Sequence, residues 1–525
     1  MVKMGVRGLL GALVVLGAAL TASANAADGR GPVLVGTEGG LVRGGAAGPV
    51  RTFRAIPYAA PPVGELRWRA PGPVVPWAGV RDATSPGSAC VQLSPGQLPP
   101  GVRESEDCLN LTVTTKAKPG AGKPVIVWVH GGGFANGTSA AVDATRMVDR
   151  GDVVVVAVNY RLGALGYLGL PGLAGSGTFG LQDQQAALRW VRGNIAAFGG
   201  DARRVTVAGQ SAGGVSACLH LTSPGSRGLF SRVVMQSGSC DTNISLVSPG
   251  VAEVAPARRK FTRPLAEVEA AGRRAAATLG CADVACLRAL DAGAVRAITP
   301  GSAVVAHGTP TLPEDPVRAL RRGHAARVPV LSGANADESR LLVSISHLLD
   351  GALTDERYAE VLADGFGARA AAVRAVYDPA RFPDASGRPS PALALAALMT
   401  DRDFACPQYE TNALLPGALG YSYSDPDAPT GVPSHAPGFT MGTPHLAELY
   451  SLFDMTPAPV RSDGSAFVAS AAQKVLADRM VDDWAAFAAG REPWRAGTTQ
   501  GFAPGAVGEV DAFAAHRCGF WRTIP

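Results

Sequence analysis

The chain has 525 residues, of which 48 are Lys or Arg and 43 are Asp or Glu, and its formal net charge is +5. A surplus this small and this dispersed argues against a partner such as nucleic acid or an anionic membrane. Length alone allows roughly three domains, but no linker and no internal repeat divides the sequence. The chain is long enough to bury a large core without help from its eight cysteines.

The first 26 residues have the pattern of a secretory signal peptide. Lys3 and Arg7 provide the positive charge, residues 9–20 form an apolar stretch, and Ala24-Asn25-Ala26 fits a cleavage site. An uncleaved membrane anchor is the alternative, but no stop-transfer pattern follows. Removing two basic and no acidic residues lowers the charge from +5 to +3, and no later stretch reaches about 18 uninterrupted apolar residues. We therefore expect a secreted, soluble mature protein without a stable membrane anchor.

The eight cysteines all lie in the part that is expected to be exported, where disulfides form. Eight cysteines allow 105 pairings. Cys90 and Cys108 bracket a loop rich in Pro and Gly, as a disulfide-closed loop would, and Cys281 and Cys286 could close a small ring. Free buried thiols are the alternative for the remaining four, which are Cys218, Cys240, Cys406 and Cys518.

In chain order, short runs of β-branched residues alternate with helical patterns. Because the runs show no polar–apolar alternation, they suit strands that are buried on both faces, and hence a mostly parallel sheet. The strand candidates are residues 125–129, 153–158, 205–207, 233–236 and 328–331. Helices are predicted for residues 181–198 and around the stripe of Leu476, Met480, Trp484 and Phe487. The pattern predicts an α/β fold with helices on both faces of the sheet.

Two regions interrupt the alternation, at about residues 245–325 and 340–435. Both are rich in Ala, Arg, Gly and Pro and poor in strand-like runs. We expect large helical insertions that lie above the sheet and shape a pocket. The predicted organisation is a single domain, residues 27–525, that contains both insertions.

The most informative motif follows the strand candidate at 205–207. Residues 209–214 read Gly-Gln-Ser-Ala-Gly-Gly, and Ser211 fits the G-x-S-x-G turn that exposes a serine hydroxyl between a strand and a helix. Side chains at Gly209 and Gly213 would collide in so tight a turn. The motif is weak alone in a chain with 65 glycines. It proposes a nucleophile that needs a base, an orienting acid and N–H donors for the acyl oxygen.

A glycine run provides the expected donors. The sequence His-Gly-Gly-Gly-Phe at 130–134 directly follows a strand candidate, and glycines there leave backbone N–H groups open to a ligand. We expect the N–H groups of Gly132, Gly133 and Ala212 to form an oxyanion hole, and a structural turn is the alternative. His130 precedes the loop and suits a structural hydrogen bond better than the role of base.

The base is expected to be a histidine, because its ordinary pKa lies near neutrality. With this elbow the chain order is Ser, then Asp or Glu, then His, which favours the late members of the eight histidines. His435 lies in a flexible-looking loop and His516 at the extreme end. His445 opens an apolar run, residues 446–453, whose predicted helix would hold the ring in position, so His445 is favoured.

The orienting acid should follow a strand and precede His445. The run at 328–331 is followed by a loop that contains Asp337 and Glu338. Position alone does not separate these two carboxylates.

Further motifs lie in order along the chain. They are Phe-Arg-Ala-Ile-Pro-Tyr at 53–58, Pro-Pro-Val-Gly at 61–64, Ser-Glu-Asp-Cys-Leu-Asn-Leu at 105–111, Val-Asn-Tyr-Arg at 158–161, Gly-Leu-Gln-Asp-Gln at 180–184, Phe-Gly-Gly-Asp at 198–201 and Gln-Ser-Gly at 236–238. Together with the glycine run and the elbow, they resemble the type-B carboxylesterase and cholinesterase family of α/β-hydrolases over nearly the whole expected mature chain. The resemblance implies an α/β-hydrolase fold and a triad of Ser211, Glu338 and His445, without a metal or organic cofactor.

The resemblance also implies disulfides. It pairs Cys90 with Cys108, Cys406 with Cys518 and, as a shortened version of a third family disulfide, Cys281 with Cys286, which leaves Cys218 to pair with Cys240.

Two departures from the family bear on the substrate. Many relatives have Glu directly before the nucleophile, where this chain has Gln210. Cholinesterases place a tryptophan in the first disulfide loop, whereas residues 90–108 contain no aromatic residue, so a cation–π site for choline is not supported. Both departures favour neutral esters.

The sequence therefore predicts a secreted serine carboxylic-ester hydrolase that acts on small, neutral, soluble or short-chain esters. A lipase-like hydrolase of longer-chain esters is one alternative, although the loop at 90–108 is short and only mildly apolar for a lid. A non-catalytic adhesion or binding protein is another, although such relatives lose triad residues. The sequence identifies neither the natural ester nor the oligomeric state, and a monomer is compatible with it.

Overall fold

The structure is a computed structural model. It describes residues 33–94, 98–118, 120–243, 247–248, 251–252, 260–299, 303–431 and 438–524. The expected signal peptide and His435 therefore lie outside the described residues.

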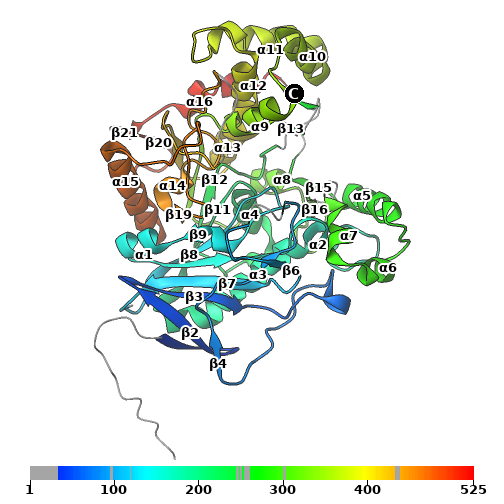
Figure 1. The fold of residues 1–525 in the computed structure, drawn as a ribbon, viewed down its shortest axis with the longest axis vertical. Helices are drawn as coiled ribbons and strands as arrows, with labels where there is room; N and C mark the ends of the chain where they lie inside the picture. The colour runs from blue at the N-terminus through cyan, green and yellow to red at the C-terminus, as the bar shows by residue number, and fades with distance from the viewer. Residues whose placement is uncertain are drawn as a thin grey trace, which may run out of the picture.

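Within these residues a 13-stranded sheet runs through the molecule (Figure 1). Its strands in spatial order are β1 (Val33–Thr37), β2 (Gly40–Ala47), β3 (Val50–Pro57), β7 (Asn110–Lys116), β10 (Val154–Val158), β8 (Lys123–Val129), β11 (Gly200–Gln210), β12 (Arg232–Gln236), β17 (Val330–Asn335), β18 (Leu419–Tyr423), β20 (Thr499–Ala503) and β21 (Ala506–Glu509), and β4 (Val80–Asp82) pairs with β2.

The sheet is parallel from β10 to β20, and toward its two ends the strands pair antiparallel, except that β4 pairs parallel with β2. Side chains of the central strands alternate between two buried clusters. In β8, Val125 and Val127 belong to one cluster, and Ile126 and Trp128 belong to the other. This burial on both faces explains the continuous β-branched runs and confirms the predicted α/β fold with a mostly parallel sheet.

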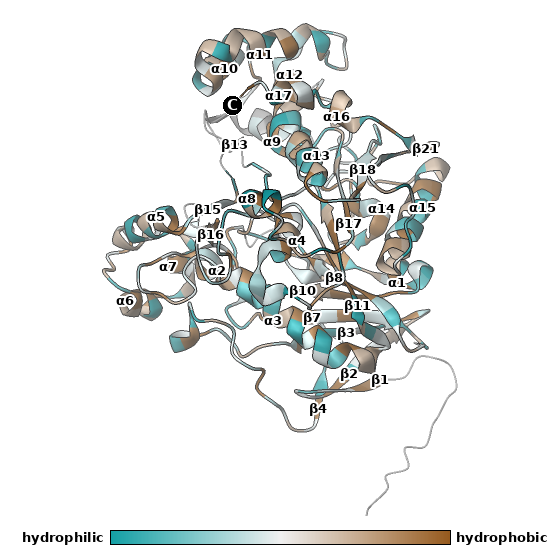
Figure 2. Ribbon diagram, turned by 180° about the vertical axis from the view of Figure 1, so that it is seen from behind, coloured by the Kyte–Doolittle hydropathy of each residue, from teal (hydrophilic) through white to brown (hydrophobic). Residues whose placement is uncertain are grey.

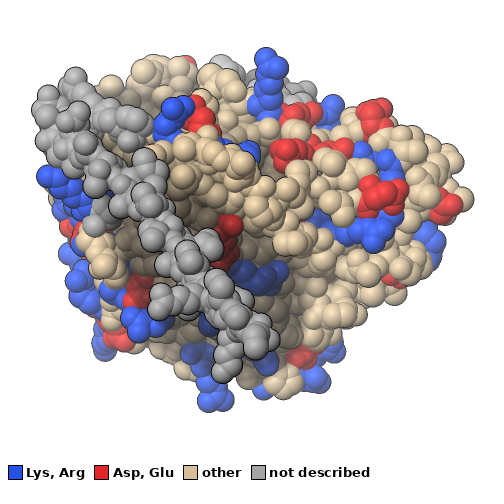
Figure 3. Space-filling view, turned by 90° about the horizontal axis from the view of Figure 1, so that it is seen from below, with Lys and Arg blue, Asp and Glu red and all other residues tan. Residues whose placement is uncertain are grey.

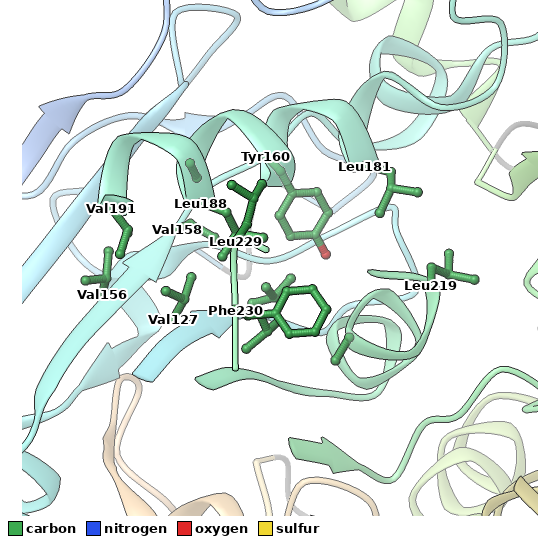
Figure 4. Close-up of a cluster of buried hydrophobic side chains, with 14 of the residues drawn as sticks. Val127, Val156, Val158, Tyr160, Leu181, Leu188, Val191, Leu219, Leu229 and Phe230 are labelled. Carbon is green, nitrogen blue, oxygen red and sulfur yellow. The ribbon is translucent and has the colours of Figure 1, made fainter. Parts of the chain in front are cut away.

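Helices cover both faces of the sheet (Figure 1). One face carries α1 (Thr145–Gly151), α14 (Leu449–Leu452) and α15 (Ala471–Ala488), and the other carries α3 (Phe179–Asn194), α4 (Ala212–Thr222) and α8 (Pro316–Arg321). Figure 4 shows Leu188 and Val191 beside Val127 and Val156, so α3 packs its apolar stripe on the sheet. The helix predicted for residues 181–198 ends earlier than expected, because its last turn, Ile195–Phe198, is a 3₁₀ helix.

Two long connections carry most of the other helices. Between β12 and β17 lie β13 (Val247–Ser248), β14 (Val251–Ala252), β15 (Thr262–Pro264), α5 (Leu265–Thr278), α6 (Val284–Ala289), α7 (Ala292–Arg296), β16 (Val305–His307) and α8. Between β17 and β18 lie α9 (Arg340–Asp350), α10 (Asp355–Phe366), α11 (Ala370–Val376), α12 (Pro391–Met399), the π-helix η9 (Thr400–Ala405) and α13 (Cys406–Ala413). The helices of the second connection gather at one end of the molecule, and together they carry both hydrophobic and hydrophilic residues (Figure 2). The division into one domain with insertions stays a prediction.

Several short elements lie between these larger ones. They are α2 (Gly163–Tyr167), the strand pairs β5 (Ala89–Cys90) with β6 (Glu104–Ser105) and β9 (Val142–Asp143) with β19 (Asp454–Met455), and the carboxyl-terminal helices α16 (Ala512–Ala515) and α17 (Cys518–Trp521).

Basic and acidic side chains are interspersed on the face seen in Figure 3. In the part of the chain that the structure describes, no helix has the length and apolar character needed to cross a bilayer.

All eight cysteines lie in described segments, and each is in a disulfide. The S–S distances are 1.98 Å for Cys90–Cys108, 2.06 Å for Cys218–Cys240, 1.94 Å for Cys281–Cys286 and 2.05 Å for Cys406–Cys518. Disulfides persist in exported proteins and are rare in the cytosol. The pairing therefore supports an oxidising compartment.

The disulfides differ in the length of chain that they close. Cys406–Cys518 spans 112 residues and Cys281–Cys286 spans five, and loop entropy makes the long closure more stabilising by about 3 kcal/mol. We predict that Cys406→Ser/Cys518→Ser lowers the melting temperature much more than the control Cys281→Ser/Cys286→Ser. Equal losses in thermal unfolding would contradict the entropic account.

Candidate active site

Ser211 occupies a strained turn between β11 and α4. Its φ is 57° and its ψ is −125°, a backbone conformation that residues other than glycine rarely adopt. A Cβ on Gly209 would lie 2.3 Å from the backbone of Gly213, and one on Gly213 would lie 2.0 Å from the carbonyl oxygen of Val129. The collision expected from the sequence is therefore confirmed, and only glycine fits both positions.

The neighbouring strand β12 and the first turn of α4 both hold this turn. The N–H of Ser211 donates to the carbonyl of Gln236 at the end of β12 (2.8 Å), and the N–H of Val215 donates to the carbonyl of Ser211 (2.9 Å). A Cβ on Gly238 would lie 2.2 Å from the Ser211 carbonyl oxygen. The serine thus stands at the carboxyl ends of parallel strands, where open α/β sheets bind their ligands.

The glycine loop after β8 lies against the elbow. A Cβ on Gly131 would lie 3.0 Å from the Cβ of Ser211, and φ is 108° at Gly132 and 62° at Gly133. Among the described residues, the N–H groups of Gly132, Gly133 and Ala212 donate to no protein acceptor. For Ala212 this follows from its place at the first position of α4. Three amides without a protein acceptor therefore lie in the glycine loop and at the first position of α4.

His130 supports the glycine loop. Its Nδ1 bonds the carbonyl of Gly131 (2.8 Å), its ring stacks on Tyr160, and the Tyr160 hydroxyl donates to the His130 carbonyl (2.8 Å). Burial lowers the pKa of His130 to about 4, so the ring is neutral near pH 7. The N–H of Gly163 also donates to the carbonyl of Phe134 (2.7 Å). These contacts fit the structural role expected for His130.

His445 contacts Glu338. Nδ1 of His445 lies 2.5 Å from Oε2 of Glu338, and the N–H of His445 donates to the Glu338 carbonyl (3.2 Å). The other carboxylate oxygen accepts from the N–H of Asn335 (2.7 Å), and Glu338 is fully buried. A carboxylate held in this way fixes both the orientation and the tautomer of the imidazole.

Asp337 points elsewhere. Its carboxylate accepts from the N–H of Thr443 (3.0 Å) and pairs with Arg340 (2.8 Å) on the wall of a cavity of about 620 Å³. Of the two carboxylates that position alone left open, Glu338, the one that the resemblance implies, is the one that contacts His445.

Other described histidines form hydrogen bonds away from Ser211, and His324 bonds Glu314. His220 bonds Gln184 and Ser226, and His516 bonds Asp401. In the described segments, no cluster of three or more His, Cys, Asp or Glu side chains is arranged to hold a metal ion.

Sequence reasoning missed Glu448, a second buried carboxylate. Its oxygens accept from Nδ2 of Asn335 (2.6 Å) and from Nε2 of Gln236 (3.3 Å). Burial and the charge of Glu338 raise the pKa of Glu448 to about 7. The sequence signal that could have indicated this site is the carboxylate of Glu448 itself, because it stands alone in an apolar run three residues after His445.

The helix predicted for residues 446–453 is mostly wrong. Residues 445–448 form turns, and α14 covers only Leu449–Leu452. Leu446 has a φ of 79°, which is incompatible with a right-handed helix. The turn lets His445 and Glu448 both lie near Asn335, whose side chain also donates to the carbonyl of Pro444 (2.9 Å).

The surroundings of His445 favour its charged form. Burial by itself lowers the pKa, but the charge and hydrogen bond of Glu338 and the charge of Glu448 outweigh it, so the pKa is raised above 6.5. The ring of Phe404 from η9 lies 5.0 Å from the imidazole. Nε2 of His445 lies 3.1 Å from Nε2 of Gln210.

This geometry agrees with the sequence comparisons. Residues 32–505 match the model of the carboxylesterase family. The chain belongs to this family. The family has the α/β-hydrolase fold, as the sheet and its helices do here.

Known carboxylesterase relatives match part of the chain. It is 38% identical to para-nitrobenzyl esterase of Bacillus subtilis (strain 168) over 323 residues, which are 59% of this chain and 63% of that protein. It is 40% identical to fumonisin B1 esterase of Sphingopyxis macrogoltabida over 331 residues, 58% and 56% of the two chains, and 38% identical to cocaine esterase of Oryctolagus cuniculus over 325 residues, 58% of each. The chain thus spans 56–63% of the length of these relatives.

The pKa of His445 gives a pH prediction. If His445 is the base, activity falls at low pH as the imidazole gains a proton, and the negative charge of Glu448 moves this fall to higher pH. We predict that Glu448→Gln moves the acid limb of kcat/KM to lower pH by about half a unit.

The control is Asp483→Asn, which also removes a buried carboxylate but one that pairs with Arg479 on α15. If the folded Glu448→Gln variant keeps the acid limb of kcat/KM at the pH of the wild type, the charge effect assigned to Glu448 is contradicted.

Proposed function

We propose that this chain is a secreted serine carboxylesterase with Ser211 as nucleophile, His445 as base and Glu338 as orienting acid. The observation that carries the proposal is the bond between His445 Nδ1 and the buried Glu338, formed beside an elbow in which Ser211 has a positive φ. Family membership supports the reaction class. The signal-like sequence at 1–26 and the four disulfides support secretion.

The reaction proceeds through an acyl-enzyme. Ser211 attacks the ester carbonyl while His445 Nε2 takes its proton, and Glu338 stabilises the imidazolium that forms. The N–H groups of Gly132, Gly133 and Ala212 bind the oxyanion, and loss of one such donor typically costs about 10²–10³-fold in kcat. His445 then protonates the departing alkoxide, and the same residue activates the water that releases the acid.

The proposed substrates are neutral esters of short or soluble acids. Gln210 is uncharged and 1% exposed, so no carboxylate directly precedes the nucleophile to attract a cationic substrate. The first disulfide loop, residues 90–108, has no aromatic side chain for cation–π binding.

The nucleophile is tested by Ser211→Ala. We predict that hydrolysis of p-nitrophenyl butyrate falls by at least about 10⁴-fold, because the proposed nucleophile is removed, while the melting temperature stays close to that of the wild type. Ser237→Ala is the matched control, since Ser237 also has a positive φ (48°) beside the elbow. Wild-type turnover in folded Ser211→Ala would reject the assignment.

The acid is tested by two neighbouring isosteric changes. We expect Glu338→Gln to lower kcat by about 10²-fold or more, because an amide stabilises neither the needed tautomer nor the imidazolium. Asp337→Asn should cost less than about tenfold, because Asp337 bonds Thr443 and Arg340 instead. Steady-state kinetics that rank the two variants in reverse would move the acid to Asp337.

A further inference from the structure

Asn335 joins the two segments that carry the proposed acid and base. It is the last residue of β17 and is fully buried. Its N–H donates to Oε1 of Glu338 (2.7 Å), and its Nδ2 donates to the carbonyl of Pro444 (2.9 Å), the residue directly before His445. The same Nδ2 donates to Oε2 of Glu448 (2.6 Å). One residue therefore contacts the acid, the backbone beside the base and the second buried carboxylate.

These contacts fix the orientation of the Asn335 amide. An amide nitrogen has two hydrogens, and both are used here, because the Pro444 carbonyl and the Glu448 carboxylate accept them. A flipped amide would place its oxygen against two other oxygens. Among the described residues, Oδ1 of Asn335 is buried without a hydrogen-bond partner. The side chain thus gives both donors to this site although its own oxygen stays unsatisfied.

An uncharged donor has a particular effect on Glu448. Burial and the charge of Glu338 raise the pKa of Glu448, and the hydrogen bond from Asn335 opposes this rise because it stabilises the carboxylate. A cation in the same place would also stabilise the carboxylate, but it would cancel the field that Glu448 exerts on His445. The amide therefore preserves the negative charge of Glu448 and leaves it free to act on the imidazole.

We propose that Asn335 is a positioning residue that anchors the His445 segment beside Glu338 and holds Glu448 in the charged form that acts on the imidazole. The proposal rests on the proposed function of Ser211, His445 and Glu338. Asn335 transfers no proton in the reaction, and it acts through His445.

The groups that face Glu448 come from several elements. Glu338 lies in the loop after β17, and His445 lies in the turn that carries Glu448 itself. Strand β12 contributes the uncharged Gln236. The other titratable neighbours are tyrosines of β18 and α14 whose pKa values are raised by burial, namely Tyr421, Tyr423 and Tyr450. Because these hydroxyls stay neutral near pH 7, Glu338 and His445 are the charged neighbours of Glu448.

The acid limb of kcat/KM reports on this arrangement. His445 has Glu338 and Glu448 as charged neighbours, with the uncharged Phe404 from η9 and Gln210 from β11 beside the ring. Without the amide of Asn335, Glu448 would take up a proton more readily near neutral pH. The imidazole would then lose one of two negative neighbours, and its pKa would fall.

The test removes the amide in the full chain. We expect Asn335→Leu, which has a similar shape and no donor, to move the acid limb of kcat/KM to lower pH by about half a unit, as Glu448→Gln does. It should also lower kcat about tenfold with KM within about twofold, because losing the bond to Pro444 is equivalent to losing one hydrogen bond. The double variant Asn335→Leu/Glu448→Gln should have the same acid limb as either single variant, because both changes remove the same charge.

Two further variants complete the test. Asn335→Ala removes the same amide without adding bulk and should show the same two effects, so the test does not depend on whether Asn335→Leu folds. Asn412→Leu is the matched control, because Asn412 of α13 donates to the carbonyl of Ser332 on the same strand (3.1 Å) and also has a buried Oδ1 without a partner among the described residues. It should leave both kcat and the acid limb unchanged.

Three results would overturn the proposal. They are full kcat in a folded Asn335 variant, an acid limb that stays at the pH of the wild type, and an additive shift of about one unit in the double variant. Failure of the proposed function is distinct, since Ser211→Ala would then hydrolyse the ester as fast as the wild type.

Discussion

The close approach of Gly213 to the carbonyl of Val129 is the constraint on which the site depends. Because neither Gly209 nor Gly213 has a Cβ, β11 can turn into α4 directly above the end of β8. The turn forces Ser211 to a φ of 57° and brings the first N–H of α4 next to the glycine loop. A single backbone contact therefore positions both the serine hydroxyl and the amides that would bind an oxyanion. Any side chain at either glycine would separate these elements.

The second determinant is buried negative charge. Glu338 and Glu448 are both fully buried, and burial of a carboxylate is costly unless hydrogen bonds or an opposite charge compensate. Asn335 provides much of the compensation, because its N–H bonds Glu338 and its side chain bonds Glu448. The opposite charge arises only when His445 is protonated. The arrangement thus favours the protonated His445 that proton transfer from Ser211 would produce, which is a form of electrostatic preorganisation for acyl transfer.

The sequence predicts the fold and the principal residues because local rules determine them. Unbroken β-branched runs give the parallel strands, and glycine spacing gives the elbow at Ser211. Contacts between distant segments escape such rules. The meeting of Gln210 with His445 joins residues 235 positions apart, and the choice of Glu338 over Asp337 depends on how one loop lies against Thr443. The predicted helix after His445 is wrong because Leu446 adopts a positive φ, which an apolar pattern does not reveal.

The central claim is that Ser211 is made reactive by His445 and Glu338. It is tested most directly by treating the wild-type protein with a fluorophosphonate and locating the adduct by peptide mass spectrometry. The account predicts one phosphonyl group per chain, attached to Ser211, with loss of esterase activity in step with labelling. Labelling at another residue, or unlabelled Ser211 in an enzyme that has lost its activity, would contradict it.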